Sequence, residues 1–307
     1  MIVALAGGVG AARFLEGLIR VIPQRELIVI GNVGDDIEVF GLHVSPDLDI
    51  VTYTLRGIVD PLKGWGIQDD TFTFLSAIRK YGYDTWFNIG DLDLATHVFR
   101  TEQLRNGQSL SAVTTKIVNR LGLRFRLLPA TDDNFQTFVI CDGIRMHFQE
   151  YMVKLQTKPS VDRVLFHGAG SAKPAKGVIN SIQKARGIII CPSNPIVSIG
   201  AILNVPRIRV ALRETDSKIV AVSPIIRGKT IKGPADKLMK AVGVEPTAVG
   251  VAQIYRDFLD TLILDQRDKK LAKKVEDLGV RAVVTNTIMR TVADKVNLAR
   301  IAMSEFR

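Results

Sequence analysis

Four aspartates gather in two short polar segments near the start of the chain, within fifteen positions of one another. The segments are Asn32–Asp36 and Ser45–Asp49, whose glycine and proline residues favour loops. Carboxylates this close repel one another unless a proton or a cation lies among them. A hard divalent ion such as Mg²⁺, shared with nucleotide phosphates, would remove that repulsion. We therefore predict Asp36, Asp47 and Asp49 as ligands of Mg²⁺, with helix caps and Asx turns as the alternative use of these residues.

A glycine-rich turn, Gly7-Gly8-Val9-Gly10, lies between an apolar segment and an amphipathic one. Backbone N–H groups at such a strand-to-helix turn face an approaching anion, and glycine lets a phosphate come close. We predict that Gly7, Gly8 and Gly10 contact a nucleotide. The dinucleotide fingerprint is incomplete because Arg13 occupies its third glycine position, and no Lys-Ser/Thr pair follows as in a Walker A loop. Turns of this kind also occur without a ligand.

The segment Pro192–Gly200 is the most specific local feature, because an apolar run leads into a polar turn that two prolines stiffen. Its hydroxyl, amide and backbone donors suit a phosphate or a base. We predict Ser193, Asn194 and Ser198 as nucleotide contacts. Local capping of the following helix by Ser193 and Asn194 would explain part of this composition.

A third polar segment, Gly90–His97, follows another apolar run. Asp91 or Asp93 can cap a helix that begins near Leu94. The spacing places His97 on the inward face of that helix. A histidine there is more often a core residue with its hydrogen bonds satisfied than a catalytic residue. Asp91 and His97 are nevertheless candidates for substrate binding.

These residues need a scaffold that brings them together, and the chain predicts an α/β fold. Strands at Ile2–Ala6 and Glu26–Ile30 flank a helix at Ala11–Val21, which makes a βαβ unit with a right-handed crossover. A second α/β pattern opens with a predicted strand at Arg163–Phe166 and runs to about residue 285. Ligands in such sheets gather at the carboxyl ends of the strands. We predict one Rossmann-like domain over residues 1–307, with three α/β/α layers, a mostly parallel sheet and a largely helical insertion at about 64–120.

Composition narrows the class of protein. The net charge is +10, but lysine and arginine are scattered rather than grouped with aromatic residues, so we predict no nucleic-acid partner and consider attraction of an anionic small substrate instead. No apolar stretch is long enough to span a membrane. The chain opens directly on an apolar strand, and its two cysteines form no disulfide framework, so we expect no signal peptide and a cytoplasmic protein.

Taken in order, these motifs resemble the 2-phospho-L-lactate transferase (CofD-like) family over essentially the whole chain. Trp65 and the Met146–Glu150 motif favour the transferase branch over related nucleotide-sugar-binding regulators. The residues that carry the resemblance are Gly7–Gly10, Ser45–Asp49, Gly64–Gly66 with Asp70–Phe72, Gly90–His97, Met146–Glu150, Pro192–Gly200 and Ser223–Ile226.

The resemblance implies a reaction and its participants. Family members join 7,8-didemethyl-8-hydroxy-5-deazariboflavin to a three-carbon acid carried on guanosine diphosphate, with Mg²⁺, and release GMP in the biosynthesis of coenzyme F-420. By position, Asp49 would contact the deazaflavin or the metal, Asn88 would be a second deazaflavin contact, and Asp47 with Asp49 would be the catalytic carboxylates. The resemblance also implies a homodimer. It leaves open whether the acid is phospholactyl, phosphoenolpyruvyl or phosphoglyceryl.

This chain departs from the family at two positions, and two other functions compete. Leu92 replaces an arginine in the family's Gly-Asp-Arg-Asp pattern, and Asn88 replaces a lysine, so acceptor or donor recognition could differ. A non-catalytic nucleotide-binding regulator on the same fold would need neither a deazaflavin pocket nor a metal site at Asp49. A nicotinamide dehydrogenase is disfavoured by the missing third glycine and by the lack of an acidic residue after Ile30.

Overall fold

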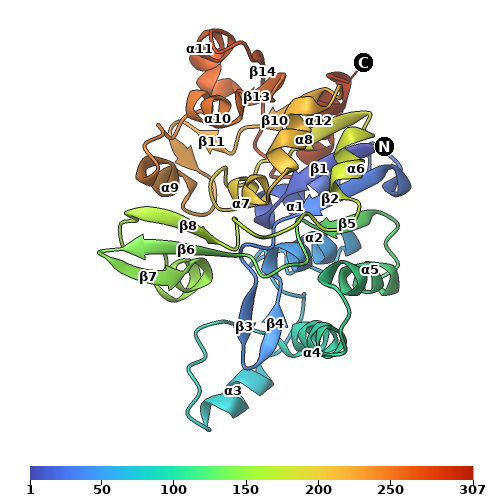
Figure 1. Cartoon of the computed structure of the whole chain (residues 1–307), viewed down its shortest axis with the longest axis vertical. Coiled ribbons are helices and arrows are strands. Elements are labelled where there is room, and N and C mark those ends of the chain that lie inside the picture. The colour runs from blue at the N-terminus through green and yellow to red at the C-terminus, as the bar shows by residue number, and fades with distance from the viewer. Residues whose placement is uncertain (307) are drawn as a thin grey trace.

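A seven-stranded, all-parallel sheet forms the centre of the protein (Figure 1). The structure is a computed structural model that describes residues 1–306. The strand order is β14-β13-β10-β9-β1-β2-β5. The strands are β1 (Ile2–Ala6), β2 (Leu27–Gly31), β5 (Arg126–Pro129), β9 (Gly187–Ile190), β10 (Ile219–Val222), β13 (Thr261–Asp265) and β14 (Arg281–Thr285). The predicted Rossmann-like fold with a mostly parallel sheet is confirmed.

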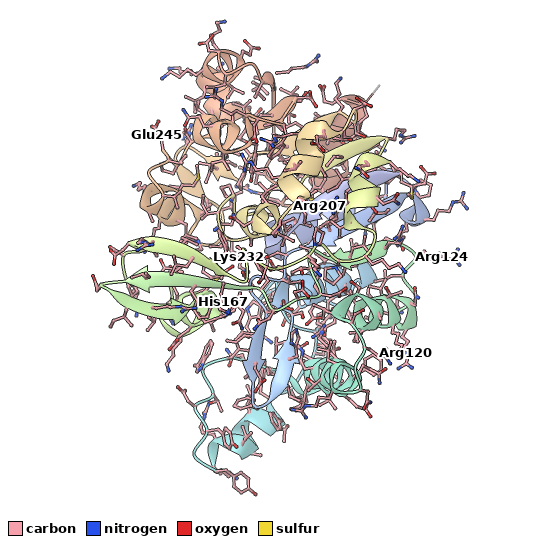
Figure 2. The ribbon with its side chains drawn as sticks, in the orientation of Figure 1. Arg120, Arg124, His167, Arg207, Lys232 and Glu245 are labelled. Atoms are coloured by element: carbon pink, nitrogen blue, oxygen red, sulfur yellow. The ribbon has the colours of Figure 1, made fainter. Side chains whose placement is uncertain are left out.

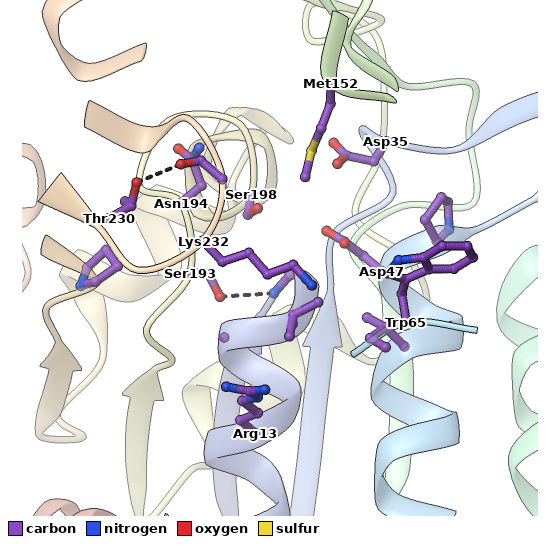
Figure 3. Close-up of a pocket in the computed structure, with 18 of the residues that line it drawn as sticks. Arg13, Asp35, Asp47, Trp65, Met152, Ser193, Asn194, Ser198, Thr230 and Lys232 are labelled. Carbon is purple, nitrogen blue, oxygen red and sulfur yellow. Dashed lines mark hydrogen bonds between the residues drawn. The ribbon is translucent and has the colours of Figure 1, made fainter. Parts of the chain in front are cut away.

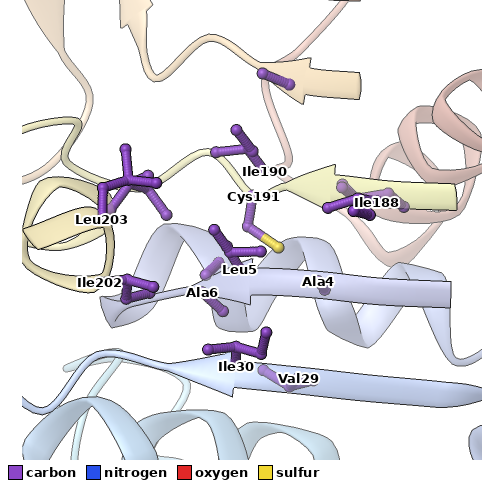
Figure 4. Packing of buried hydrophobic residues seen from close by; sticks show 14 of the residues in the cluster. Ala4, Leu5, Ala6, Val29, Ile30, Ile188, Ile190, Cys191, Ile202 and Leu203 are labelled. Carbon is purple, nitrogen blue, oxygen red and sulfur yellow. The ribbon is translucent and has the colours of Figure 1, made fainter. Parts of the chain in front are cut away.

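The inner strands are buried along their whole length, as their continuous apolar sequences predict. Leu5 of β1 pairs with Ile30 of β2 on one side and with Ile190 of β9 on the other. Figure 4 shows these side chains in the buried core together with Cys191, and burial raises the pKa of its thiol far above the usual value. Such a thiol is inert, and Cys141 is likewise free and buried.

Helices cover both faces of the sheet (Figure 1). On one face α1 (Gly8–Leu18) packs against α2 (Pro46–Arg56) and α12 (Val292–Ser304). A second group of helices consists of α6 (Val178–Gln183), α7 (Ile199–Asn204) and α8 (Ile208–Glu214), in which α8 packs against the other two. Gly17 permits the close approach of α1 to α12, because a Cβ there would collide with the backbone of Lys295. The amphipathic pattern of α1 is thus satisfied by two neighbouring helices.

Several elements lie outside these layers. The predicted insertion holds three helices joined by irregular segments: α3 (Thr73–Arg79), α4 (Asp91–Arg105) and α5 (Leu110–Arg120). A hairpin of β3 (Ile37–Val39) and β4 (Leu42–Val44) extends toward α3 in Figure 1. A separate antiparallel sheet joins β6 (Gln136–Cys141), β7 (Ile144–His147) and β8 (Arg163–His167). The sequence placed a strand at residues 163–166 in the main α/β pattern, but it belongs to this smaller sheet.

The remaining elements complete the second half of the chain. They are β11 (Ile225–Ile226), β12 (Lys229–Thr230), α9 (Ala235–Ala241), α10 (Ala248–Tyr255), α11 (Ala272–Glu276) and the short helices η1 (Gln24–Glu26), η2 (Glu150–Lys154) and η3 (Gln266–Leu271). Among residues 1–306, no helix combines the length and apolarity needed to cross a bilayer. Exposed arginines such as Arg120, at the end of α5, and Arg124 and Arg207, in loops, are spread over the face seen in Figure 2.

Candidate functional site

A cleft of about 740 Å³ opens where the carboxyl ends of β1, β9, β10 and β13 meet. This is the edge at which ligands bind in open α/β sheets, and the volume suits two small-molecule substrates. Its walls come from the start of α1, the start of α2, the segment around Trp65, the β7–η2 turn and the loops after β9, β10 and β14 (Figure 3). All but two of the predicted site residues line it; Asp36 and Asp91 do not.

The glycine-rich turn and the Pro192–Gly200 loop form one wall. The Gly7 N–H donates to Ser193 Oγ at 3.2 Å, so segments distant in sequence are joined at the first turn of α1. A Cβ on Gly10 would collide with the carbonyl oxygen of Pro192, which explains the glycine there. Asn194 Oδ1 accepts from the backbone N–H groups of two following residues, so this side chain shapes its own loop. Neither Ser193 nor Asn194 caps the following helix α7, which has no side-chain cap; Asn194 instead makes a turn within the loop.

Two buried carboxylates, those of Asp35 and Asp47, face each other across one amide. Asn32 Nδ2 donates to Asp35 Oδ1 at 3.1 Å and to Asp47 Oδ2 at 2.8 Å, and Gln149 Nε2 donates to the other oxygen of Asp35 at 3.2 Å. Burial, and then the charge of Asp47, raise the pKa of Asp35 well above its usual value. Burial raises the pKa of Asp47 to about 7, against hydrogen bonds from Asn32 and Gly8. The pair therefore holds a proton or requires a cation at neutral pH.

The other two predicted metal ligands have different partners. Asp36 Oδ2 accepts from Ser45 Oγ at 2.7 Å and lies 2.9 Å from His43 Nε2, away from the cleft. The carboxylate of Asp49 is bound by both terminal nitrogens of Arg100. The structure thus does not bring Asp36, Asp47 and Asp49 together as one set of ligands. No group of three or more acidic, histidine or cysteine side chains within residues 1–306 is arranged to hold a metal.

Asp49 belongs to a buried network that Arg100 organises beneath the cleft. Arg100 is 1% exposed; its Nη1 lies 3.0 Å from Asp49 Oδ2 and 3.2 Å from His97 Nδ1. His97 Nε2 in turn lies 3.3 Å from Asp93 Oδ2, and the Tyr53 hydroxyl donates to Asp93 Oδ1 at 2.7 Å. His97 is confirmed as an inward residue of α4, and it also lines the cleft.

The carboxyl groups of this network differ in their acidity. Burial raises the pKa of Asp49, although the charges of Arg100 and His97 act against this. At Asp93 burial also acts to raise the pKa, but the hydrogen bond and charge of His97 outweigh it, so the pKa is lowered. Burial acts to lower the pKa of Arg100, but the charge and hydrogen bond of Asp49 and the charges of Tyr53 and Asp36 together raise it. Asp93 is therefore the carboxylate of this wall that stays ionised most readily.

The start of α4 explains why Asp91 is absent from the cleft. The carboxylate of Asp91 accepts from the backbone N–H groups of Thr73 and Phe74, which begin α3. Asp70 in turn accepts from the backbone N–H groups of Leu92 and Asp93 in the first turn of α4. The two aspartates thus cap each other's helices, and the hydrogen bond from Thr71 leads those that lower the pKa of Asp91 to about 2.

The two departures from the family pattern fall in different environments. Asn88 lines the cleft beside Phe87, so its change from lysine alters the cleft itself. Leu92 is 54% exposed on α4 and outside the cleft, so no cation is lost from the cleft at this position.

Sequence reasoning missed several polar residues that the fold brings to the cleft. Asp35 and Gln149 lay within motifs already recognised, but nothing in the sequence paired them. Arg100 follows His97 by three positions on one helix face, which is a signal that could have been read. Arg13 and Lys232 line the cleft from elements far apart in the chain.

The chain is similar to known proteins over nearly its whole length. The family of 2-phospho-L-lactate transferase CofD matches residues 2–301. A phosphoenolpyruvate transferase of Kitasatospora aureofaciens is 44% identical, covering 99% of this chain and 97% of the relative. A 2-phospho-L-lactate transferase of Methanosarcina mazei is 37% identical, covering 99% of this chain and 100% of the relative. Protein BH3568 of Bacillus halodurans, of the UPF0052 family, shares the fold, with a TM-score of 0.66 over 98% of each chain at 16% identity.

Proposed function

This chain belongs to the 2-phospho-L-lactate transferase CofD family and is a transferase of that type. From the residues of its cleft we propose the reaction that it catalyses. It moves a phospho-linked three-carbon acid, of the phospholactate or phosphoenolpyruvate type, from guanosine diphosphate to 7,8-didemethyl-8-hydroxy-5-deazariboflavin. GMP is released, in the biosynthesis of coenzyme F-420. The observation that carries the proposal is that one cleft joins a phosphate-type helix start to an aromatic wall with buried carboxylates.

The donor nucleotide fits the wall formed by the start of α1 and the loop after β9. Gly7, Gly8 and Gly10 bring the first turn of α1 to the cleft, and the helix dipole favours negative charge there. Ser193 and Ser198 offer hydroxyl groups on the same wall. Binding the diphosphate at this point leaves the guanosine to extend along the carboxyl ends of β10 and β13.

The acceptor fits the opposite wall, where apolar and aromatic side chains suit a planar deazaflavin ring. Tyr53, Trp65 and Phe87 line this wall, and Asn88 lies next to Phe87. His97 and Asp93 supply its polar end. A ring held among the aromatic residues would direct its hydroxylated chain toward the carboxylates, since the rest of that wall is apolar.

Mg²⁺ is compatible with the carboxylate pair. Asp35 and Asp47 present oxygen ligands, which this ion prefers, and a positive charge between them would offset the burial that raises both pKa values. We propose Asp47 and Asp35 as its protein ligands, in place of the trio expected from the sequence. The remaining ligands would be phosphate oxygens and water, since the protein supplies no larger cluster within its described residues. When bound, the ion would neutralise charge on the diphosphate.

The chemistry is a phosphoryl-centred displacement. The terminal hydroxyl oxygen of the acceptor chain forms a bond to the phosphorus that carries the acid, while the bond to GMP breaks and its electron pair leaves with GMP. Asp93 accepts the hydroxyl proton, because it lies on that wall and its lowered pKa keeps it in the ionised form that a proton acceptor needs. Asp49 acts with Arg100 to fix His97, which in turn lies against Asp93. No covalent intermediate is required.

A calorimetric titration of the deazaflavin into the protein with GDP and Mg²⁺ tests this function. We expect saturable binding that is lost in Asp49→Ala and kept in Asp91→Asn, a matched control whose carboxylate lies outside the cleft. Binding of GDP without any response to the deazaflavin would instead support the non-catalytic regulator. The homodimer expected from the resemblance stays a prediction, which sedimentation equilibrium checks.

A further inference from the structure

Four basic side chains line the cleft, and two of them, Arg13 and Lys232, converge near the glycine-rich turn without an acidic partner. Arg13 lies on the second turn of α1, and Lys232 lies on the turn between β12 and α9. None of the ion pairs formed by residues 1–306 includes either side chain. Most exposed basic residues point into open water, whereas these two face a cavity. They are therefore available to an anionic ligand.

The two side chains converge on one point of the segment that carries Trp65. A Cβ built on Gly64 would lie 3.4 Å from Lys232 Nζ and 4.0 Å from an Nη atom of Arg13. Lys232 Nζ also donates to the carbonyl oxygen of Lys63 at 3.2 Å. Figure 3 shows Lys232 reaching over the end of α1 that bears the glycine-rich turn, with Arg13 on the same helix. Like charges this close favour an anion between them, because it offsets their repulsion.

The acidity of Lys232 agrees with this placement. Its pKa is lowered, first by burial and then by the charge of Arg13. A negative group bound between the two cations would offset both effects, because its charge favours the protonated lysine. The site would thus gain more from an anion than an isolated surface lysine does.

We infer that Arg13 and Lys232 bind the carboxylate of the donor's three-carbon acid. This inference rests on the proposed function. In such a donor only an ester oxygen and one carbon separate the carboxylate from the phosphorus, so its subsite must adjoin the phosphate subsite. Arg13 meets this requirement because it lies on the helix whose first turn faces the diphosphate. A guanidinium also matches a carboxylate with two parallel hydrogen bonds.

The same cations could instead contact the diphosphate, and this alternative predicts a different result. A diphosphate contact is made equally with GDP and with the acid-bearing donor, whereas a carboxylate contact is made only with the donor. The ratio of the two dissociation constants therefore separates the two assignments. A purely structural role of Lys232, as the anchor of the Lys63 backbone, would change neither affinity selectively.

The experiment measures Kd by calorimetry for GDP and for guanosine diphosphate-linked phosphoenolpyruvate. We expect Lys232→Met and Arg13→Met to weaken donor binding by about tenfold and to leave GDP binding unchanged, since each removes a charge-assisted hydrogen bond. Lys232→Arg should restore most of the donor affinity. Lys229→Met and Arg20→Met are matched controls, because both residues are basic and lie outside the cleft.

Each outcome bears on the inference. Equal loss of GDP and donor affinity, or no loss of either, overturns it and leaves the proposed function intact. If the wild-type protein binds the donor no more tightly than GDP, the inference is overturned and the proposed function is kept. A wild-type protein that binds neither nucleotide refutes the proposed function and the inference together.

Discussion

Replacing Asp47 by asparagine should stabilise the protein while abolishing its activity. Asp47 is buried, and its carboxylate shares Asn32 with Asp35. Its pKa is raised from 3.8 to about 7 in the folded protein, so the folded state binds a proton that the unfolded chain releases. The free energy of unfolding therefore falls as the pH rises from about 4 to about 7, and it stays low above that range.

The magnitude follows from the size of this shift. Each pKa unit corresponds to about 1.4 kcal/mol, so the ionised Asp47 carboxylate costs the folded state roughly 4 kcal/mol at pH 8. Asparagine keeps an oxygen that can accept from Asn32 and carries no charge. We expect Asp47→Asn to raise Tm at pH 8 by roughly 6 °C and to change it little near pH 4. Transferase activity should be lost, because the proposed ligand of Mg²⁺ is gone.

Thermal unfolding followed by circular dichroism from pH 4 to pH 8 makes the measurement. Asp84→Asn is the control, because Asp84 is an exposed carboxylate whose loss changes the net charge equally. Mg²⁺ should raise the Tm of the wild-type protein at pH 8 and leave that of Asp47→Asn unchanged. A variant no more stable than wild type at pH 8, with the same pH dependence, would refute the reasoning about the buried pair.

Three further outcomes are expected. Arg100→Met leaves the Asp49 carboxylate buried and unpaired, so urea denaturation should show a loss of about 3–5 kcal/mol that shrinks in an Asp49→Asn background. Gly10→Ala places a Cβ against the Pro192 carbonyl and displaces α1, so the calorimetric Kd for GDP should rise on the order of tenfold; an unchanged Kd would place the phosphate elsewhere. Leu92→Arg restores the family residue on an exposed face, so KM for both substrates should stay the same in steady-state assays.

The sequence by itself determined the fold class and the family. Short continuous apolar runs such as Ile2–Ala6 and Gly187–Ile190 are buried on both faces, which is the property that identifies parallel strands. The order of local motifs, from Gly7–Gly10 to Ser223–Ile226, identified the family, and the comparisons confirm it. Both conclusions depend on local pattern, which a chain displays without its neighbours.

Element boundaries and the smaller sheet were less accessible. The predicted helix at Ala11–Val21 is Gly8–Leu18 in the structure, because the glycine-rich turn is itself the first turn of α1. The antiparallel sheet of β6, β7 and β8 was not predicted beyond one strand. The Asp142-Gly143 turn between β6 and β7 is a hairpin signal that the sequence does carry, whereas β8 pairs with β6 across a long connection that leaves no local pattern.

Only the tertiary structure decided which charged side chains share a site. The sequence predicted that Asp36, Asp47 and Asp49 share one site. In the structure Asp36 contacts His43, and Asp49 is bound by Arg100. Asp47 lies instead beside Asp35, and Asn32 bonds to both. A side chain's direction at the end of a strand depends on its local backbone and on partners distant in sequence. The acidity of each carboxyl group depends on burial and on those partners, so it too exists only in the folded chain.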